Sequence, residues 1–193
     1  MDNLQDGPTY KAALTMGYFG FLRASNLLCP IASTWGGPHT LKRSDVLIHP
    51  SGILILLRST KTLVPDVSPR VVALPRIHSS PACPTQAWKD YITAVPAALD
   101  KPAFLLKDGS PLTPSRLVQV LRMTLIVLGC PYAQAVSSHS LRRGGAQAAQ
   151  ASGAAREDIK YHGTWRSEGA LKAYIPHQSS SRVAMSMARL FAL

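Results

Sequence analysis

Apolar and polar residues in the first half of the chain follow two different periods. Residues 8–25 place large apolar side chains at positions i, i+4, i+7 and i+8 from Leu14, which is the stripe of an amphipathic helix. Residues 46–48, 53–57 and 70–74 are instead short apolar runs bounded by turn residues, a pattern typical of β-strands. This half therefore predicts one long helix followed by three short strands.

The second half of the chain keeps helical spacing. Thr113 and Pro114 are typical of a helix start, and Gly153 is typical of a residue just past a helix end. Trp88 is expected in the core of its helix. The helices that the pattern predicts span residues 82–95, 114–128, 139–153, 157–161, 167–174 and 180–193. With the three strands they indicate an α+β chain that is mostly helical.

Composition suggests a basic, globular domain. The chain has 193 residues, of which 46% are hydrophobic, enough for one domain with a sizeable core. Lys and Arg outnumber Asp and Glu by 21 to 10, so the net charge is +11, and a domain this basic usually binds a polyanion. Aromatic residues are few, at 7%, which favours contacts with a duplex backbone over base stacking. The sequence therefore predicts double-stranded DNA as the partner; the alternative is a soluble protein that is merely basic.

Cysteine usage and hydropathy exclude several classes of protein. Cys29, Cys83 and Cys130 lie far apart and form no Cys/His cluster, so neither a zinc site nor any other metal site is expected. The N-terminus has no apolar segment that resembles a signal peptide. The longest apolar runs, such as residues 53–57, are too short to cross a bilayer. We therefore expect an intracellular protein with no membrane partner.

The segment with the most chemical content is Ser-Ser-His-Ser-Leu-Arg-Arg-Gly-Gly at residues 137–145. His139 and Arg142 are three residues apart and would share one face of a helix. Ser137 and Ser138 could cap the start of that helix, where backbone N–H groups favour an anion. An imidazole and a guanidinium at such a helix start suit the oxygens of a phosphate. Taken alone, His-x-x-Arg could equally be a solvated helix face.

Downstream residues extend this motif at fixed spacing. Gly153 and Ile159 are followed by Gly-Thr-Trp at residues 163–165 and by Tyr174. With His139 and Arg142, this order resembles the C-terminal half of the catalytic domain of the tyrosine recombinase (phage integrase) family. The Gly-x-Trp form looks most like eukaryotic mobile-element versions such as Crypton recombinases.

The N-terminal half contains two further parts of the resemblance. Gly-Phe-Leu-Arg, ending at Arg23, reproduces the first half of the phrase that carries the family's first catalytic Arg, although Asn26 stands where the family usually has Glu. Lys61, in Ser-Thr-Lys-Thr, matches the mobile catalytic Lys on the second hairpin of the family's three-stranded antiparallel sheet. The resemblance thus implies the DNA breaking-rejoining fold and an active site of the kind found in that family. The implied catalytic residues are Arg23, Lys61, His139, Arg142, Trp165 and Tyr174.

The resemblance also implies a role for each of these residues. The two arginines would hold the non-bridging oxygens of a phosphodiester, and His139 would bond the same phosphate or relay a proton. Trp165 would donate its indole N–H. Tyr174 would attack phosphorus and form a 3′-phosphotyrosine, while Lys61 would protonate the 5′ oxygen. No cofactor is implied, because guanidinium groups supply the positive charge.

Each assignment has a simpler alternative. Arg23 could be an ordinary cation at a helix end and Lys61 a solvated turn lysine, while Trp165 could be a core aromatic and Tyr174 an interface residue. Further arginines could contact DNA phosphates or be ordinary surface charges. These are Arg116, Arg122, Arg143 and Arg166.

The resemblance also covers domain organisation and assembly. We expect residues 1–193 to be a single catalytic domain that lacks the family's N-terminal core-binding domain, and to act as a homo-oligomer, dimer to tetramer, on DNA. Residues 180–193 could pack on a neighbouring protomer or on their own. The expected function is site-specific DNA recombination, in the nucleus if the source is eukaryotic. The alternatives are a domesticated DNA-binding module without catalysis, supported by Asn26, and type IB topoisomerase activity.

Overall fold

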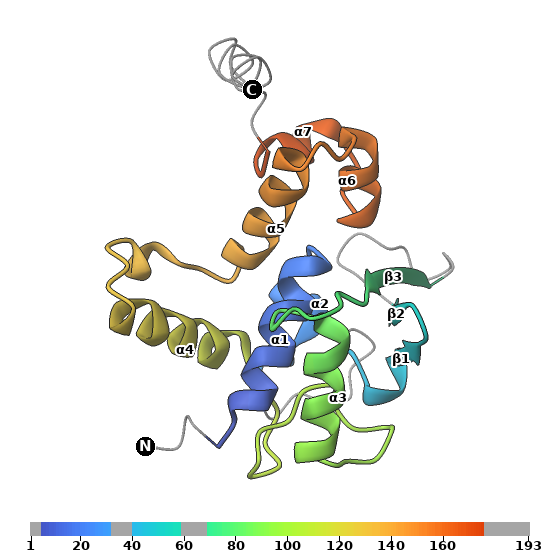
Figure 1. Ribbon diagram of the computed structural model, residues 1–193, viewed down its shortest axis with the longest axis vertical. Coiled ribbons are helices and arrows are strands. Elements are labelled where there is room, and N and C mark those ends of the chain that lie inside the picture. Colours follow the sequence, from blue (N-terminus) through green and yellow to red (C-terminus); the bar gives the residue numbers. More distant parts are fainter. Residues whose placement is uncertain (1–4, 32–39, 59–68, 176–193) are drawn as a thin grey trace. The chain divides into compact units, whose positions relative to one another are not determined.

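The computed structural model describes residues 5–31, 40–58 and 69–175. The chain divides into two compact units, residues 1–145 and 146–193, and each is described by itself (Figure 1). The first unit contains helices and a small sheet, and the second is helical. No helix in the described ranges is long and apolar enough to cross a bilayer.

Helix α1 begins as predicted and ends earlier. It spans Gly7–Phe19, with Pro8 in its first turn. The predicted helix at 8–25 was therefore too long, because the chain turns at Phe21, whose φ of 47° lies in the left-handed region. A separate short helix, α2, spans Ala24–Leu27, and Arg23 occupies its N-cap position.

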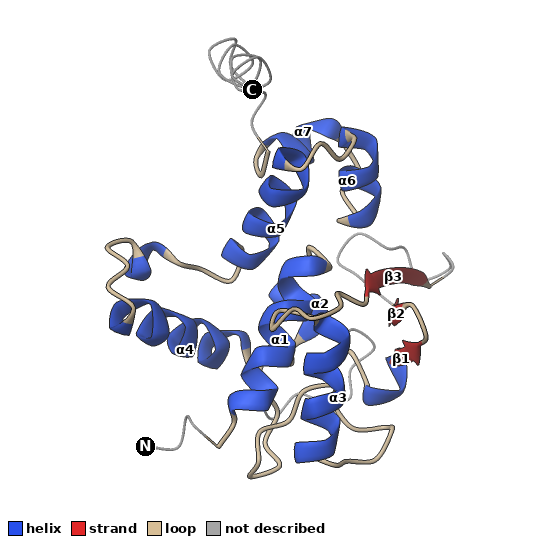
Figure 2. Cartoon of the chain, viewed as in Figure 1, coloured by secondary structure: helices blue, strands red, loops and turns tan. Residues whose placement is uncertain are grey.

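The three predicted strands are confirmed. Strands β1 (Val46–His49), β2 (Gly52–Leu57) and β3 (Arg70–Pro75) follow a 3₁₀ turn, η3 (Arg43–Asp45). They form an antiparallel sheet in the order β1-β2-β3 (Figure 2). Ile53 pairs with Leu74 and Ile55 with Val72, and all four side chains are buried. The alternate apolar positions of the central strand therefore form the face that packs into the core.

An aromatic cluster joins helix α3 (Pro84–Ala94) to the rest of the core. Trp88 is 1% exposed, as the sequence predicted, and its ring lies 5.4 Å from that of Tyr91 and 5.5 Å from that of Phe104. The Tyr91 and Phe104 rings stack at 5.5 Å. Large stacked rings of this kind contribute much of the buried apolar area of a domain of this size.

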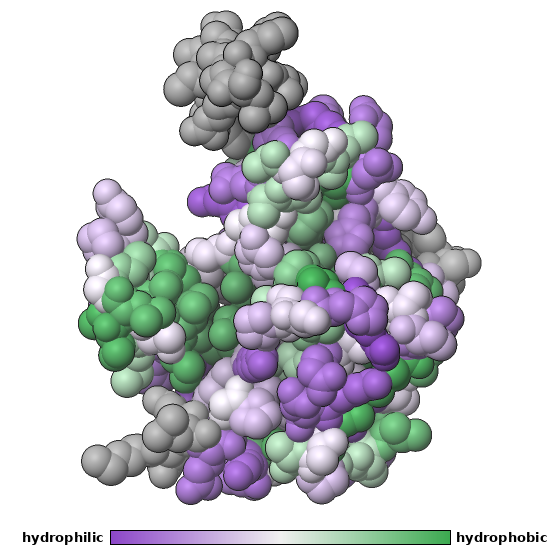
Figure 3. Space-filling model, in the orientation of Figure 1, coloured by the Kyte–Doolittle hydropathy of each residue, from purple (hydrophilic) through white to green (hydrophobic). Residues whose placement is uncertain are grey.

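Helix α4 (Pro114–Val127) is packed mainly through its first half. The Thr113 hydroxyl accepts the Arg116 N–H at its start, as a helix cap does, and Leu117 is buried. Towards its C-terminal end most of the exposed side chains are apolar, and Figure 3 shows an apolar patch over this helix. The exposed members are Met123, Ile126, Val127 and Leu128.

Helix α5 (Ser140–Ala151) passes from the first unit into the second. It is preceded by a 3₁₀ turn, η4 (Ala133–Ala135), and followed by α6 (Arg156–His162) and α7 (Glu168–Lys172). These helices agree with the predicted ranges within a few residues, and Gly153, with a φ of +90°, follows α5. The predicted helix at 180–193 lies outside the described residues.

Candidate active site

The predicted site begins with Arg142, which lies in the first turn of α5. Its side chain is 1% exposed, and its Nη1 donates a hydrogen bond to the carbonyl oxygen of Phe21. A contact between residues 121 positions apart fixes the start of α5 on the turn that follows α1. That turn continues directly into Arg23.

Arg23 is half-buried at the start of α2. Its carbonyl oxygen accepts the N–H of Asn26 at 2.8 Å, which closes the short helix. Its side-chain nitrogen Nη1 is buried and, among the described residues, has no hydrogen-bond partner. A buried guanidinium nitrogen without an acceptor is costly unless a ligand supplies one. This arrangement suits an anion.

His139 lies in the turn just before α5, one residue earlier than the predicted helix start. The Ser137 hydroxyl accepts the N–H of His139 at 3.3 Å, and the Ser140 hydroxyl accepts the N–H of Ser137 at 2.9 Å. Ser137 and Ser140 thus hold the turn on which His139 is presented, and the imidazole is exposed.

A small apolar cavity shows that the Arg23 and His139 segments are neighbours. Leu22 and Ala24, on either side of Arg23, line it together with Ser138 and Leu141, which flank His139. The segments that carry Arg23, His139 and Arg142 are therefore neighbours in the first unit. Their catalytic roles remain predictions.

Trp165 and Tyr174 meet in the second unit. Their ring centroids are 5.2 Å apart at an interplanar angle of 59°. Trp165 is 5% exposed and lies directly against Gly163, where an added Cβ would be 1.8 Å from its ring. Thr164 between them has a φ of +61°. The Gly-Thr-Trp segment thus folds the indole back on Gly163 and beside Tyr174.

The backbone around Tyr174 is anchored at two points. Gln147 Nε2 donates to the Tyr174 carbonyl oxygen at 3.1 Å, and Arg156 Nη1 donates to that of Ile175 at 3.3 Å. Arg156 also forms an ion pair with Glu168. The side chain of Ile175 is fully buried, whereas that of Tyr174 is half-buried. Sequence reasoning missed Gln147 and Arg156, because their contacts depend on how α5, α6 and the segment after α7 pack.

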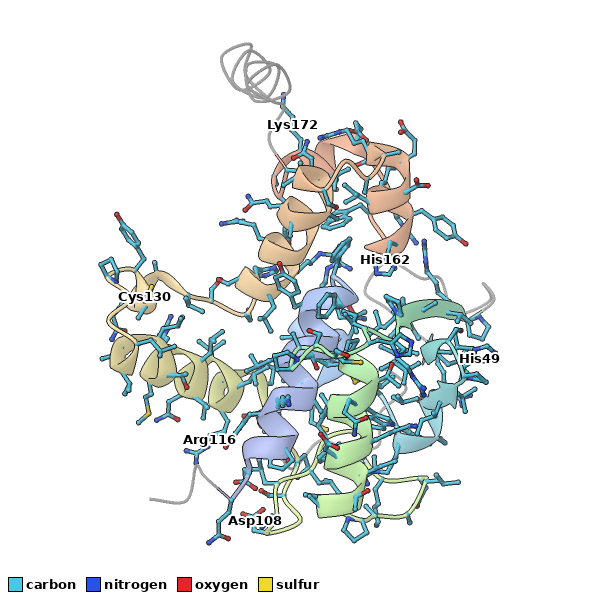
Figure 4. All side chains as sticks on the ribbon, in the orientation of Figure 1. His49, Asp108, Arg116, Cys130, His162 and Lys172 are labelled. Carbon is cyan, nitrogen blue, oxygen red and sulfur yellow. The ribbon has the colours of Figure 1, made fainter. Side chains whose placement is uncertain are left out.

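The four arginines predicted to bind DNA fall into two pairs. Arg116, labelled in Figure 4, donates from Nε to the Tyr10 hydroxyl at 3.2 Å, and Arg122 donates from Nε to the Val136 carbonyl oxygen at 2.8 Å. Both guanidinium groups thus hold elements of the first unit together. Arg143 and Arg166 are exposed.

The segment that carries Lys61 lies outside the described residues, so its place in the site stays a prediction. Arg58, which ends the described part before it, pairs with Asp45 at 2.7 Å. Asp45 is 1% exposed and also accepts the N–H of Lys42 at 2.9 Å. Arg58 is therefore tied to η3, the turn that precedes β1. Within the described ranges, no three His, Cys, Asp or Glu side chains gather closely enough to hold a metal ion.

No protein-family model and no curated protein matches this sequence. Among solved structures, the chain is similar to the XerH site-specific recombinase bound to difH substrate, with a TM-score of 0.66 and 16% identity over 97% of this chain and 48% of XerH. It is also similar to the XerA recombinase, with a TM-score of 0.64 and 17% identity over 98% of this chain and 64% of XerA.

A third similar structure is the Tn1549 transposon integrase in complex with a circular intermediate DNA, with a TM-score of 0.53 and 16% identity over 92% of this chain and 57% of the integrase. This chain therefore spans about half to two-thirds of the length of these proteins. At such identities the likeness concerns the fold. The chain has the mostly helical α+β fold, with a three-stranded antiparallel sheet, of the tyrosine recombinase catalytic domain.

Proposed function

We propose that this chain is the catalytic domain of a site-specific DNA recombinase that cuts and rejoins strands through a 3′-phosphotyrosine. The observation that carries the proposal is the pair of guanidinium groups in the first unit. Arg142 bonds the carbonyl oxygen of Phe21, two residues before Arg23, and Arg23 has a buried nitrogen without a partner among the described residues. Two guanidinium groups brought to the same turn could match the two non-bridging oxygens of one phosphodiester.

In the proposed reaction the Tyr174 hydroxyl passes its proton to His139, its oxygen attacks phosphorus, and the bond from phosphorus to the 5′ oxygen breaks. Lys61 gives a proton to that oxygen, and Arg23 and Arg142 neutralise the charge that builds on the non-bridging oxygens. Rejoining runs the same steps in reverse, with a 5′ hydroxyl as the attacking group. The Trp165 ring beside Tyr174 would restrict the phenol to few orientations.

A nicked duplex that loses a short 5′-hydroxyl fragment after cleavage tests the proposal. We expect the wild-type chain to form a protein–DNA adduct that survives denaturing electrophoresis and disappears after protease treatment. Tyr174→Phe keeps the ring next to Trp165 and removes the nucleophile, so it should bind the duplex with unchanged affinity and form no adduct. Adduct formation by Tyr174→Phe would exclude Tyr174 as the nucleophile.

A DNA-binding module without catalysis is the second candidate. Asn26, which stands where the family usually has Glu, favours it: the residue is 7% exposed and its N–H closes the turn on the Arg23 carbonyl oxygen. An amide there carries no charge with which to orient a guanidinium. Salt-sensitive duplex binding without any adduct would support this candidate. Relaxation of supercoiled DNA without strand exchange would indicate the type IB topoisomerase reaction instead.

The proposal extends to assembly and location. Strand exchange between two duplexes requires more than one active site, so we expect a homo-oligomer, dimer to tetramer, on DNA. The Crypton-like Gly-x-Trp motif ending at Trp165 suggests a eukaryotic mobile element, and such an enzyme would act in the nucleus.

A further inference from the structure

Helix α5 lies in close contact with the end of helix α1 and the turn after it at Gly145. A Cβ atom added to Gly145 would lie 2.1 Å from the carbonyl oxygen of Tyr18 and 2.8 Å from Cδ1 of the Phe21 ring. The first of these atoms belongs to the backbone and cannot move aside by rotating a side chain. Any residue other than glycine at this position therefore requires α5 to move away from α1.

The contact between α5 and Phe21 also positions Arg142. Arg142 and Gly145 are three residues apart in α5 and face the same way, and both touch Phe21. The Phe21 ring lies under Gly145, and the Phe21 carbonyl oxygen accepts the hydrogen bond from Arg142 Nη1. Phe21 itself is held in a left-handed conformation, with a φ of 47°. Arg23 follows two residues later, so the distance between the two guanidinium groups depends on how closely α5 rests on this turn.

We infer that Gly145 is a positioning residue for the cleavage site. Its missing side chain lets α5 rest on the Tyr18–Phe21 turn, and this contact sets Arg142 at a fixed distance from Arg23. The inference rests on the proposed function, because that distance matters only if both arginines bind one phosphate. Moving a catalytic group by about 1 Å can slow a reaction about 10²-fold.

Gly144 provides a matched control. It is the neighbouring glycine in the same helix, and a Cβ added there would lie 3.4 Å from Cε2 of Tyr18, an ordinary van der Waals contact. Gly144→Ala and Gly145→Ala gain the same helix propensity. Only the second forces α5 away from α1.

The experiment compares the full chain with both variants on the nicked duplex. The readouts are the adduct-forming rate at saturating DNA, the Kd for the duplex and the thermal midpoint. We expect Gly144→Ala to react within about twofold of wild type, and Gly145→Ala to react about 10²-fold more slowly while its Kd changes less than about threefold. A general loss of structure would instead weaken binding and reaction together. Equal rates for the two variants would overturn the inference.

Two further results keep the test decisive. If Gly145→Ala does not fold, adding Phe21→Ala removes the ring contacts and leaves only the Tyr18 carbonyl oxygen in the way, and the same readouts apply. If the wild-type chain forms no adduct, the proposed function fails on its own. Hydrogen exchange then decides the inference: faster exchange of the Arg143 amide in Gly145→Ala than in Gly144→Ala supports the contact, and equal exchange rejects it.

Discussion

At the scale of single residues, the Tyr91 hydroxyl makes three hydrogen bonds inside the core. It accepts from Arg43 Nη2 and from the Leu105 N–H, each at 2.7 Å, and donates to the Ala103 carbonyl oxygen at 3.0 Å. Tyr91 is fully buried, and buried polar groups need such partners. One side chain of α3 thus fixes residues 103–105 and the start of η3.

Tyr91→Phe should lower the free energy of unfolding by about 2 to 4 kcal/mol, because the Leu105 N–H and one Arg43 nitrogen lose their acceptor inside the core. The measurement is urea denaturation at neutral pH. Tyr132→Phe is the control, since Tyr132 is 77% exposed, and it should change the free energy by less than about 0.5 kcal/mol. Similar effects of the two substitutions would show that the hydroxyl network contributes nothing.

The same residue predicts how stability depends on alkaline pH. Burial raises the pKa of Tyr91, and this outweighs the lowering effects of the Leu105 N–H and of Arg43. An unfolded tyrosine titrates near 10, so above that pH the unfolded chain loses this proton while the folded chain keeps it. The folded state therefore loses stability as pH rises from about 10 towards the raised pKa. Tyr91→Phe should remove this part of the pH dependence, and Tyr132→Phe should leave it.

At the scale of elements, α7 carries the chain to Tyr174 with only one turn of helix. Its N-cap, Ser167, accepts the Ala170 N–H at 3.1 Å, and Gly169 lies inside the helix with open space around it. A helix this short depends on its cap, since its own propensity cannot sustain it. Single substitutions in α7 should therefore change the stability of the helix that leads to Tyr174.

Ser167→Ala and Gly169→Ala should act on α7 in opposite directions. Loss of the cap should cost about 1 kcal/mol, and replacement of a helical glycine should gain up to about 1 kcal/mol. Hydrogen exchange at the Ala170 and Leu171 amides measures both effects, with faster exchange expected for Ser167→Ala and slower exchange for Gly169→Ala. Unchanged exchange in both variants would mean that α7 is held by packing alone.

The elements also show what a sequence can predict in this fold. Periodicity located all three strands and most helix ends, because these depend on local alternation and on residues such as Thr113 and Gly153. It failed after Phe19, where apolar spacing continues to residue 22 although the chain turns at Phe21. A left-handed phenylalanine is stabilised by tertiary contacts and leaves no local signal.

The candidate site could also be predicted only in part from the sequence. Motif spacing selected the candidate residues but did not predict their contacts. The structure places the Trp165 ring beside that of Tyr174 and brings Arg142 to the turn before Arg23. The residues that hold them could not be read from spacing, because their contacts join positions far apart in the chain. Gly145 against Tyr18 and Gln147 against the Tyr174 carbonyl oxygen are examples.

At the scale of the whole molecule, the net charge of +11 overstates the charge available to a partner. Several arginines bond groups within their own unit through their guanidinium nitrogens, among them Arg43, Arg116 and Arg122. Arg166 is exposed instead. A cation already bonded to a carbonyl or hydroxyl oxygen must give up that bond to reach a phosphate, whereas an exposed one only sheds water and counterions.

The salt dependence of duplex binding should therefore distinguish exposed from structural arginines. A plot of log K against log salt concentration has a slope of about −0.9 for each phosphate neutralised. Arg166→Gln should weaken binding and reduce the slope by about 1. Arg122→Gln should leave the slope unchanged and lower the thermal midpoint instead, because its Nε bond to the Val136 carbonyl oxygen is lost.

Fluorescence anisotropy across a salt series measures the slope. If Arg122→Gln reduced the slope as much as Arg166→Gln, Arg122 would have to leave Val136 for the DNA, and the division between structural and DNA-facing arginines would be wrong.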